Sequence, residues 1–243
     1  MYSLKPYSLL LSFFLLLLHN AAASDPLFSS CSDSNNYTDN DPFANNLNRL
    51  MAQLTSNSPC TGYALSSIDH GPNRVNGLAL CRADVNRTTC KSCIHHAYTK
   101  IRQLCPWRKQ GKIWFDECLL RYSDVEFFGE IDTKDVFILV NTQNASSPLL
   151  QFDVQVMHLM NSLKVEACRA PALLFAVKEM DVGHSEKLYG LAQCTRDLSI
   201  EDCGECLEKA IAQLPGCCGG RRGARVVGGS CSVRYEMYPF YTA

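Results

Sequence analysis

The chain has little net charge, and it lacks the familiar hydrolase motifs. Lys and Arg total 23, Asp and Glu total 24, and the formal net charge is −1. Without an excess of basic residues there is no field to attract nucleic acid or an anionic membrane surface. The sequence has no Gly-x-Ser-x-Gly elbow and no His-Glu-x-x-His motif, the patterns that mark many hydrolytic sites. We therefore do not expect an enzyme, and we expect no cofactor and no metal.

Long apolar runs are also missing, except at the start of the chain. Residues 9–18 are mostly apolar, follow the single lysine Lys5, and lead to three alanines that end at Ala23. This pattern predicts a secretory signal peptide over residues 1–23. No later segment approaches the roughly 18 uncharged apolar residues that a spanning helix needs. We expect a secreted chain without a membrane span.

Cysteine is abundant and it repeats. All 14 cysteines lie after residue 23, and such a density after a signal peptide predicts disulfides. Five cysteines and an Arg-Tyr pair recur at one constant offset of 113 residues: Cys81, Cys90, Cys93, Cys105, Cys118 and Arg121-Tyr122 match Cys194, Cys203, Cys206, Cys218, Cys231 and Arg234-Tyr235. A gapless register of this length indicates a tandem repeat of one domain.

The repeat resembles a known family. Its Cys-x8-Cys-x2-Cys spacing, preceded by Gly-Leu-Ala-x-Cys and followed by Ser-Cys-Ser-Val-Arg-Tyr-Glu, is similar to that of the plant cysteine-rich repeat secretory proteins. These share their domain with the antifungal seed protein ginkbilobin and with the ectodomains of cysteine-rich receptor-like kinases. The resemblance implies an α+β fold of two tandem ginkbilobin-like domains, each an antiparallel sheet packed with two helices and cross-linked by disulfides. We place the first domain at residues 24–131 and the second at 132–243, and expect the apoplast as location.

Local patterns predict the same order of elements in both halves. Asp41-Pro42 begins a helix whose apolar residues follow helical spacing, and two short strands and a second helix follow. The closing strands are expected within 113–122, 125–128 and 225–238. Residues 136–141 take the place of the Cys31 strand in the second half. This order favours an α+β domain with an antiparallel sheet.

The two Cys-x-x-Cys motifs, Cys203-Gly-Glu-Cys206 and its match Cys90–Cys93, raise two other interpretations, redox exchange and zinc binding. A Cys-x-x-Cys motif at a helix start can support thiol exchange, but no thioredoxin-like βαβ pattern surrounds it. Zinc binding by Cys90, Cys93 and the following His95-His96 is the second. The second copy has no such histidines, and an oxidised secreted chain disfavours zinc. We expect both motifs to be structural.

Spacing alone leaves many disulfide pairings open. The resemblance implies five pairs: Cys31–Cys105, Cys81–Cys90, Cys93–Cys118, Cys194–Cys203 and Cys206–Cys231. Val140 stands where the second repeat would need a cysteine for Cys218, so Cys217 or Cys168 is its expected partner. Cys60 is expected to stay outside the three pairs of its own domain.

The resemblance also implies a binding site. Ginkbilobin is similar to a mannose-binding lectin that uses an Asn, an Arg and a Glu, and the matching positions here are Asn141, Arg225 and Glu236. Amide, guanidinium and carboxylate groups offer complementary donors and acceptors to sugar hydroxyls. We expect Glu236 to be exposed on the outward face of its strand, and Arg225 to approach it through the bend at Gly228-Gly229. The first repeat holds none of the three residues: the matching positions are Ser32, Lys112 and Ser123.

Two functions remain open. The chain is expected to bind mannose-containing glycans in antifungal defence, or to contact another cell-surface protein as receptor ectodomains do. The secretory route further predicts glycosylation at three sequons, Asn36, Asn86 and Asn144.

Overall fold

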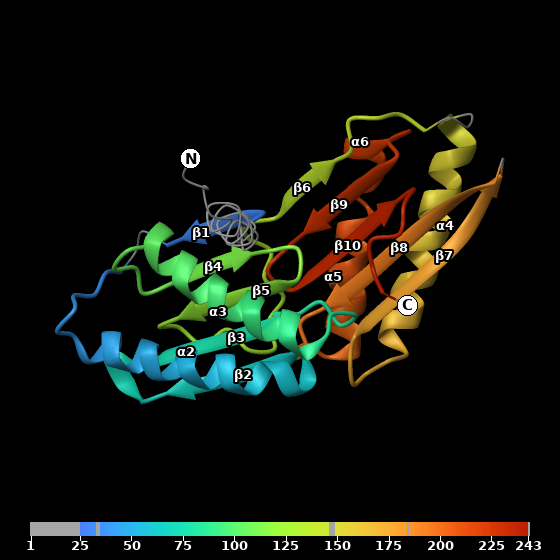
Figure 1. The fold of residues 1–243 in the computed structure, drawn as a ribbon. Helices are drawn as coiled ribbons and strands as arrows, with labels where there is room; N and C mark the ends of the chain where they lie inside the picture. Colours follow the sequence, from blue (N-terminus) through green and yellow to red (C-terminus); the bar gives the residue numbers. More distant parts are fainter. Residues whose placement is uncertain (1–24, 33–34, 146–148, 184, 243) are drawn as a thin grey trace, which may run out of the picture.

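The computed structural model describes residues 25–32, 35–145, 149–183 and 185–242. The expected signal peptide, residues 1–23, lies outside the described residues. The chain forms two α+β repeats, each built on one five-stranded antiparallel sheet (Figure 1). No helix in this described part is long and apolar enough to cross a membrane.

The two repeats have nearly the same element order. The first repeat contains β1 (Phe28–Cys31), α2 (Pro42–Thr61), β2 (Tyr63–Ile68), the 3-10 helix η1 (Gly71–Asn73), β3 (Val75–Cys81), α3 (Arg87–Leu104), β4 (Gly111–Trp114) and β5 (Cys118–Ser123). The second contains β6 (Phe137–Val140), α4 (Leu149–Cys168), β7 (Phe175–Gly183), β8 (Glu186–Cys194), α5 (Ile200–Ile211), α6 (Leu214–Cys218), β9 (Gly223–Val227) and β10 (Cys231–Glu236). The sheet orders β1-β4-β5-β3-β2 and β6-β9-β10-β8-β7 are equivalent, so the sequence repeat is also a structural one.

Local signals begin and end the helices. Pro42 occupies the first turn of α2, and Gly62 ends that helix with φ 77° and an N–H bond to the Ser58 carbonyl, which suits a residue without Cβ. The side chain of Asn86 caps α3 by accepting from the Thr89 N–H, and Ser199 caps α5 by accepting from the Asp202 N–H. These bonds satisfy amide donors that have no partner inside the helix.

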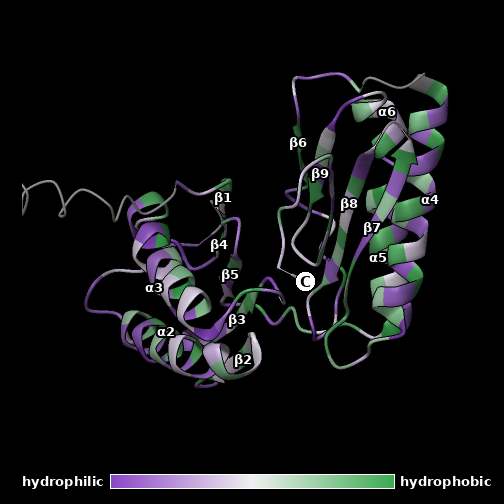
Figure 2. Cartoon of the chain, turned by 45° about the vertical axis from the view of Figure 1, so that its right-hand side comes forward, coloured by the Kyte–Doolittle hydropathy of each residue, from purple (hydrophilic) through white to green (hydrophobic). Residues whose placement is uncertain are grey.

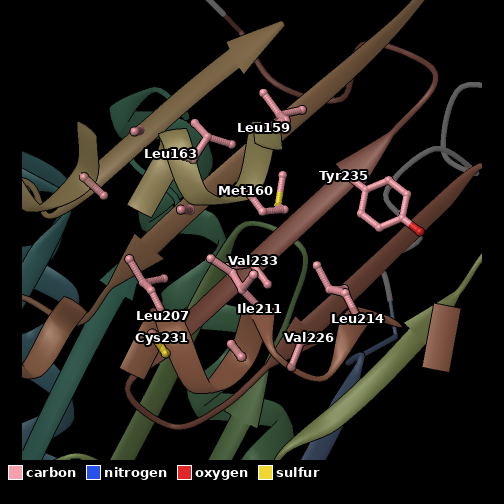
Figure 3. Packing of buried hydrophobic residues seen from close by; sticks show 14 of the residues in the cluster. Leu159, Met160, Leu163, Leu207, Ile211, Leu214, Val226, Cys231, Val233 and Tyr235 are labelled. Atoms are coloured by element: carbon pink, nitrogen blue, oxygen red, sulfur yellow. The ribbon is translucent and has the colours of Figure 1, made fainter. Parts of the chain in front are cut away.

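Each long helix packs closely on a strand at one glycine. A Cβ added to Gly77 on β3 would lie 2.6 Å from Leu50 Cδ2 of α2, and one added to Gly190 on β8 would lie 2.6 Å from Leu163 Cδ1 of α4. These are the glycines of the repeated Gly-Leu-Ala-x-Cys motif. Glycine is needed at this place in the motif because the helix lies so close to the strand. Around it, side chains from α4, α5, β9 and β10 fill the core of the second repeat (Figure 3).

Six disulfides cross-link the described residues. Five are the pairs that the family resemblance implies, and the sixth joins the adjacent residues Cys217 and Cys218. Cys60 and Cys168 are free, with Cys60 exposed and Cys168 half-buried. The Cys31–Cys105 bond ties β1 to the end of α3, whereas β6 has no such anchor because Val140 replaces the cysteine.

One expectation for local structure is wrong, and one element was not expected. Residues 125–128 form no strand but turn away from β5, because Phe127 packs into the contact between the two repeats, where the Arg121 guanidinium lies 3.8 Å from its ring centre. The short helix α6 has no counterpart in the first repeat and was not expected. It carries the Cys217–Cys218 bond.

The two repeats pack through the outward faces of their sheets. The helices lie on the far sides and the sheets face one another (Figure 2). An apolar cluster joins them and consists of Leu78, Leu80, Trp114, Leu119, Phe127 and Val227. The indole nitrogen of Trp114 donates to the Gly228 carbonyl at 3.0 Å, and the Gln193 side chain donates to the Cys81 carbonyl at 3.0 Å. The strand face that was expected to meet solvent is therefore partly an internal interface.

Candidate ligand-binding face

Arg225 and Glu236 lie on the neighbouring strands β9 and β10 of the second sheet, and Asn141 directly follows β6 on the other side of β9. Arg225 on β9 is opposite Leu139 of β6 on one side and Arg234 of β10 on the other. Glu236 is opposite Gly223, and the Asn141 N–H donates to the Gly223 carbonyl at 2.8 Å. Strand alternation directs Arg225 and Glu236 to the same outward face. The pairing register of β9 and β10 brings Arg225 and Glu236 near each other. The expectation that a bend at Gly228-Gly229 does this is therefore wrong.

The Arg225 side chain is committed to the other repeat. Its guanidinium binds the carboxylate of Asp116, which lies in the turn between β4 and β5, and only 13% of the side chain is exposed. Burial, followed by the nearby charge of Arg234, lowers the pKa of Arg225. A ligand can bind this guanidinium only if it shares the guanidinium with Asp116 or displaces the Asp116 carboxylate.

Asp116 is the centre of an ionic cluster between the repeats. Besides Arg225 it contacts Arg82 at 3.3 Å and Arg234 at 3.2 Å. Burial alone would raise the pKa of Asp116, but the three arginines, with Arg225 foremost, hold it below its usual value. Opposite charges nearby favour the ionised form of a carboxyl group, so Asp116 is a stable anion that holds three cations.

Glu236 is less accessible than expected. Only 8% of the residue is exposed, which corrects the expectation of an exposed carboxylate: the physical cause is that the side chain folds onto its own sheet. Its Oε1 accepts from Arg234 Nε at 3.1 Å, while Oε2 is buried and has no hydrogen-bond partner in the described part of the chain. A Cβ on Gly223 would lie 1.8 Å from that oxygen, so the carboxylate occupies space that only glycine leaves open.

Asn141 is half-buried beside them. Its Oδ1 accepts from the Gln143 N–H at 2.9 Å, which is a local turn contact. The amide oxygen therefore shapes the chain after β6, and the amide nitrogen is the group left to meet a ligand.

The last described residues cross this face as an aromatic strap, Tyr238–Thr242. Tyr238 Oη is 3.1 Å from Arg234 Nη2, and the Phe240 ring centre is 4.1 Å from the Arg234 guanidinium carbon. The Phe240 carbonyl accepts from Arg82, and the Thr242 N–H donates to Asp84. Burial, followed by the charge of Glu179, raises the pKa of Tyr241 to about 12. The strap joins the second repeat to the first and covers Arg234.

The corresponding face of the first repeat is neutralised in a parallel way. Lys112 contacts Asp132 at 2.7 Å and Asp135 at 2.5 Å, and Arg121 contacts Asp132 at 3.2 Å. Ser123 stands where the second repeat has Glu236, so this face offers no matching carboxylate. The two faces therefore differ in the group that would accept from sugar hydroxyls.

The cavity between the repeats that lies beside Asp116 is small. About 80 Å³ of space is lined by Arg225, Arg234 and Asp116 together with apolar residues such as Leu191 and Trp114. A few waters fit such a polar space, but a sugar ring does not. A ligand of this face must therefore lie toward the Asn141 and Glu236 end.

Sequence reasoning missed Asp116 and the aromatic strap. The repeat offers no signal for Asp116, because the matching position is Gly229. The run Tyr238-Pro-Phe-Tyr241 is a visible concentration of aromatic residues, and it could have indicated a packed C-terminal segment. Among the described residues, no group of three or more His, Cys, Asp or Glu side chains is arranged to hold a metal ion.

Paired sheets, disulfide-bonded repeats and an ionic contact between them define a tandem cysteine-rich α+β protein. The chain belongs to the salt stress response/antifungal family, whose model matches residues 30–125 and 140–238. It is 46% identical to the antimicrobial ginkbilobin-2-like protein of Castanea crenata, over 95% of this chain and 96% of that one. It is 47% identical to cysteine-rich repeat secretory protein 38 of Arabidopsis thaliana, over 88% of this chain and 85% of that one.

The fold matches a solved ectodomain. The tandem DUF26 ectodomain of the Arabidopsis thaliana cysteine-rich receptor-like protein PDLP8 superposes with a TM-score of 0.76, covering 88% of this chain and 98% of that one. Sequence identity is 24%, so this similarity establishes the architecture of two tandem repeats and nothing about the ligand.

Proposed function

We propose that this protein is secreted and acts outside the cell in defence against fungi. The observation that carries the proposal is the 46% identity to an antimicrobial protein along nearly the whole of both chains. The disulfides of both repeats suit an oxidising extracellular location. The test is a hyphal growth assay with the purified, oxidised protein. Inhibition by the native protein, and none by the reduced and alkylated protein, is the expected result; no inhibition of any fungus tested contradicts the proposal.

We further propose that the second repeat recognises mannose-containing glycans through Asn141, Arg225 and Glu236. Three features support this: Arg225 and Glu236 lie on adjoining strands with Asn141 bonded to Gly223 beside them, Glu236 Oε2 lacks a partner among the described residues, and the amide nitrogen of Asn141 is available. Sites with so little aromatic stacking bind weakly, so we expect a dissociation constant near the millimolar end, or about −4 kcal/mol.

Calorimetric titration with mannose and a mannose glycan array test the sugar site. Arg225→Ala or Glu236→Ala should remove about 1.5–3 kcal/mol of binding free energy, enough to abolish the signal. Lys112→Ala and Ser123→Ala are the matched controls in the first repeat and should bind as the wild type does. Second-repeat variants that bind as well as the wild type rule out this site.

Contact with another protein is the second candidate, favoured by the way Arg225 is used. Its guanidinium is already held by Asp116, and a receptor-like kinase, the Arabidopsis thaliana cysteine-rich receptor-like protein kinase 25, is 34% identical over 96% of this chain and 35% of its own length. Growth inhibition that persists although the glycan array is silent supports this candidate over the sugar site.

We propose that the three sequon asparagines carry glycans. Asn36, Asn86 and Asn144 are exposed. Asn86 also caps α3 through its Oδ1, which leaves its amide nitrogen to carry the sugar. Digestion of the secreted protein with an N-glycosidase should increase its electrophoretic mobility, and each Asn→Gln variant should remove one step of that shift.

A further inference from the structure

The outward side of α4 is unusually apolar for a surface helix. Leu150 is 81% exposed, Val154 62% and Val165 44%. The helix carries only three formally charged residues, Asp153, Lys164 and Glu166, in its 20 residues. Surface helices normally turn charged and polar side chains to solvent, and exposed apolar patches often mark contact sites. On this side of α4, exposed His158 and Asn161 separate Leu150 and Val154 at its start from Val165 at its end.

The same fold in the first repeat does not show this surface. The outward positions of α2 hold Asn45, Asn48, Arg49 and Asn57. Ile200, which is 44% exposed at the start of α5, corresponds to Arg87 at the start of α3. Because the two repeats share one architecture, the apolar side chains of α4 and α5 are not required by it.

A groove runs between α4 and α5 on this side. Figure 2 shows both helices on the outer side of the second repeat, away from the first. The groove has a volume of about 720 Å³, and Val165, Cys168 and Ile200 contribute to its lining. Gly204 leaves it open: a Cβ there would lie 3.6 Å from the Cys168 thiol. The groove lies at the C-terminal end of α4, and its apolar residues lie among charged ones.

The charges at the rim of the groove are self-complementary. Lys164 pairs with Glu208 at 3.2 Å and Lys209 with Glu205 at 2.5 Å within the chain. Arg169 and Glu201 also line the groove, and neither forms a salt bridge with another described residue. They lie at the same end, where α4 finishes and α5 begins. If two copies are related by a twofold axis here, Arg169 of each copy can pair with Glu201 of the other, which gives two ion pairs across the contact.

We propose that the α4–α5 groove binds a second copy of this chain in a twofold dimer. The apolar side chains of the two copies, Val165 and Ile200 foremost, cover one another. Arg169 of each copy meets Glu201 of the other. The Asn141, Arg225 and Glu236 face lies on the opposite side of the second sheet, so the dimer leaves the sheet faces of both copies in place.

Sedimentation velocity of the mature, disulfide-bonded protein over a range of concentrations tests the proposal. We expect a monomer–dimer equilibrium. Arg169→Glu and Glu201→Arg should each raise the dimer dissociation constant at least about tenfold, because each places like charges together twice. The double variant with both changes should restore dimerisation, since the exchange recreates the pairs.

A charged substitution at an apolar residue of the groove, together with a matched control, completes the design. Val165→Glu should abolish the dimer, whereas Val125→Glu, at a 60% exposed valine of the first repeat, should leave it intact. Unchanged thermal unfolding of each variant shows that the fold is kept. Maleimide labelling gives a second readout: the rate at Cys168 should fall as protein concentration rises, while the exposed Cys60 keeps its rate.

Several results overturn the proposal. A monomer at every concentration shows that the groove does not bind a second copy. A dimer whose dissociation constant is unaffected by the single charge reversals, or one that the double variant fails to restore, places the dimer contact elsewhere. Protection of Cys60 in place of Cys168 does the same.

Discussion

The carboxylate of Asp116 in the first repeat binds the guanidinium of Arg225 in the second, although 109 residues separate them. Arg82 and Arg234 bind the same carboxylate, so a single anion in one turn holds cations from both repeats. This cluster lies on the face that the sequence assigns to a sugar. A ligand bound at the proposed site would therefore be coupled through Arg225 to the contact between the repeats.

Removal of the Asp116 carboxylate should destabilise the protein. Asp116→Ala leaves Arg225, whose side chain is only 13% exposed, without its partner. An uncompensated, largely buried charge typically costs about 1–3 kcal/mol, and the 38% exposure of the Asp116 side chain places the effect within this range and not above it. Urea denaturation measures the change. Asp116→Ala/Arg225→Ala should recover part of the loss, and Glu126→Ala, which breaks an exposed pair with Arg74, should have little effect.

The same cluster predicts a pH dependence. The folded-state pKa of Asp116 is lowered by its arginines, so its contribution to the free energy of unfolding is complete above the unfolded pKa of about 4. That contribution is lost as the pH falls below this value and through the folded pKa. Urea denaturation from pH 6 to pH 2.5 should show the wild type and Asp116→Ala converging toward acid. A difference between them that stays constant with pH excludes the ionised carboxylate as its source.

Gly223 should resist substitution because Glu236 occupies its free side. In Gly223→Ala the new Cβ would lie 1.8 Å from Glu236 Oε2, so the carboxylate must swing away from Arg234. Overpacking of this kind destabilises by about 1–3 kcal/mol. Thermal unfolding should show the loss, and Gly223→Ala/Glu236→Ala should relieve it. Gly216→Ala is the control, since nothing lies within 4 Å of a Cβ at that position. Equal stability of the Gly223→Ala single and double variants would contradict the clash.

The disulfides should differ in how much they contribute to the unfolding free energy, according to the length of the loop that each one closes. Cys31–Cys105 spans 74 residues of sequence, whereas Cys217–Cys218 joins neighbours. In the chain-entropy account a loop of that length contributes about 4 kcal/mol, and a bond between neighbours contributes almost nothing through the unfolded chain. Cys31→Ala/Cys105→Ala should therefore lower the unfolding free energy far more than Cys217→Ala/Cys218→Ala. Similar losses in guanidinium titrations would show that the vicinal bond stabilises the folded state itself.

Much of each repeat follows from its own sequence. The offset of the cysteines identifies the duplication, and Asp41-Pro42 predicts the start of α2, which the structure retains. Gly77 and Gly190 in the repeated motif mark the close approach of helix and strand. Such signals are readable because each depends on a local conformation, or on a period that one element imposes on its own side chains.

The surroundings of the candidate site depend on contacts between the two repeats, which the local pattern of the sequence does not predict. Alternation along β10 correctly directs Glu236 outward from its own core, but it cannot tell whether that side meets solvent, a folded-back carboxylate or another domain. Tertiary structure decided that the face of Arg225 and Arg234 packs against Asp116, and that Phe240 of the C-terminal strap closes over Arg234. The physical reason is that burial of apolar surface between the sheets positions both repeats, and the charged side chains then take whichever partners that packing brings within reach.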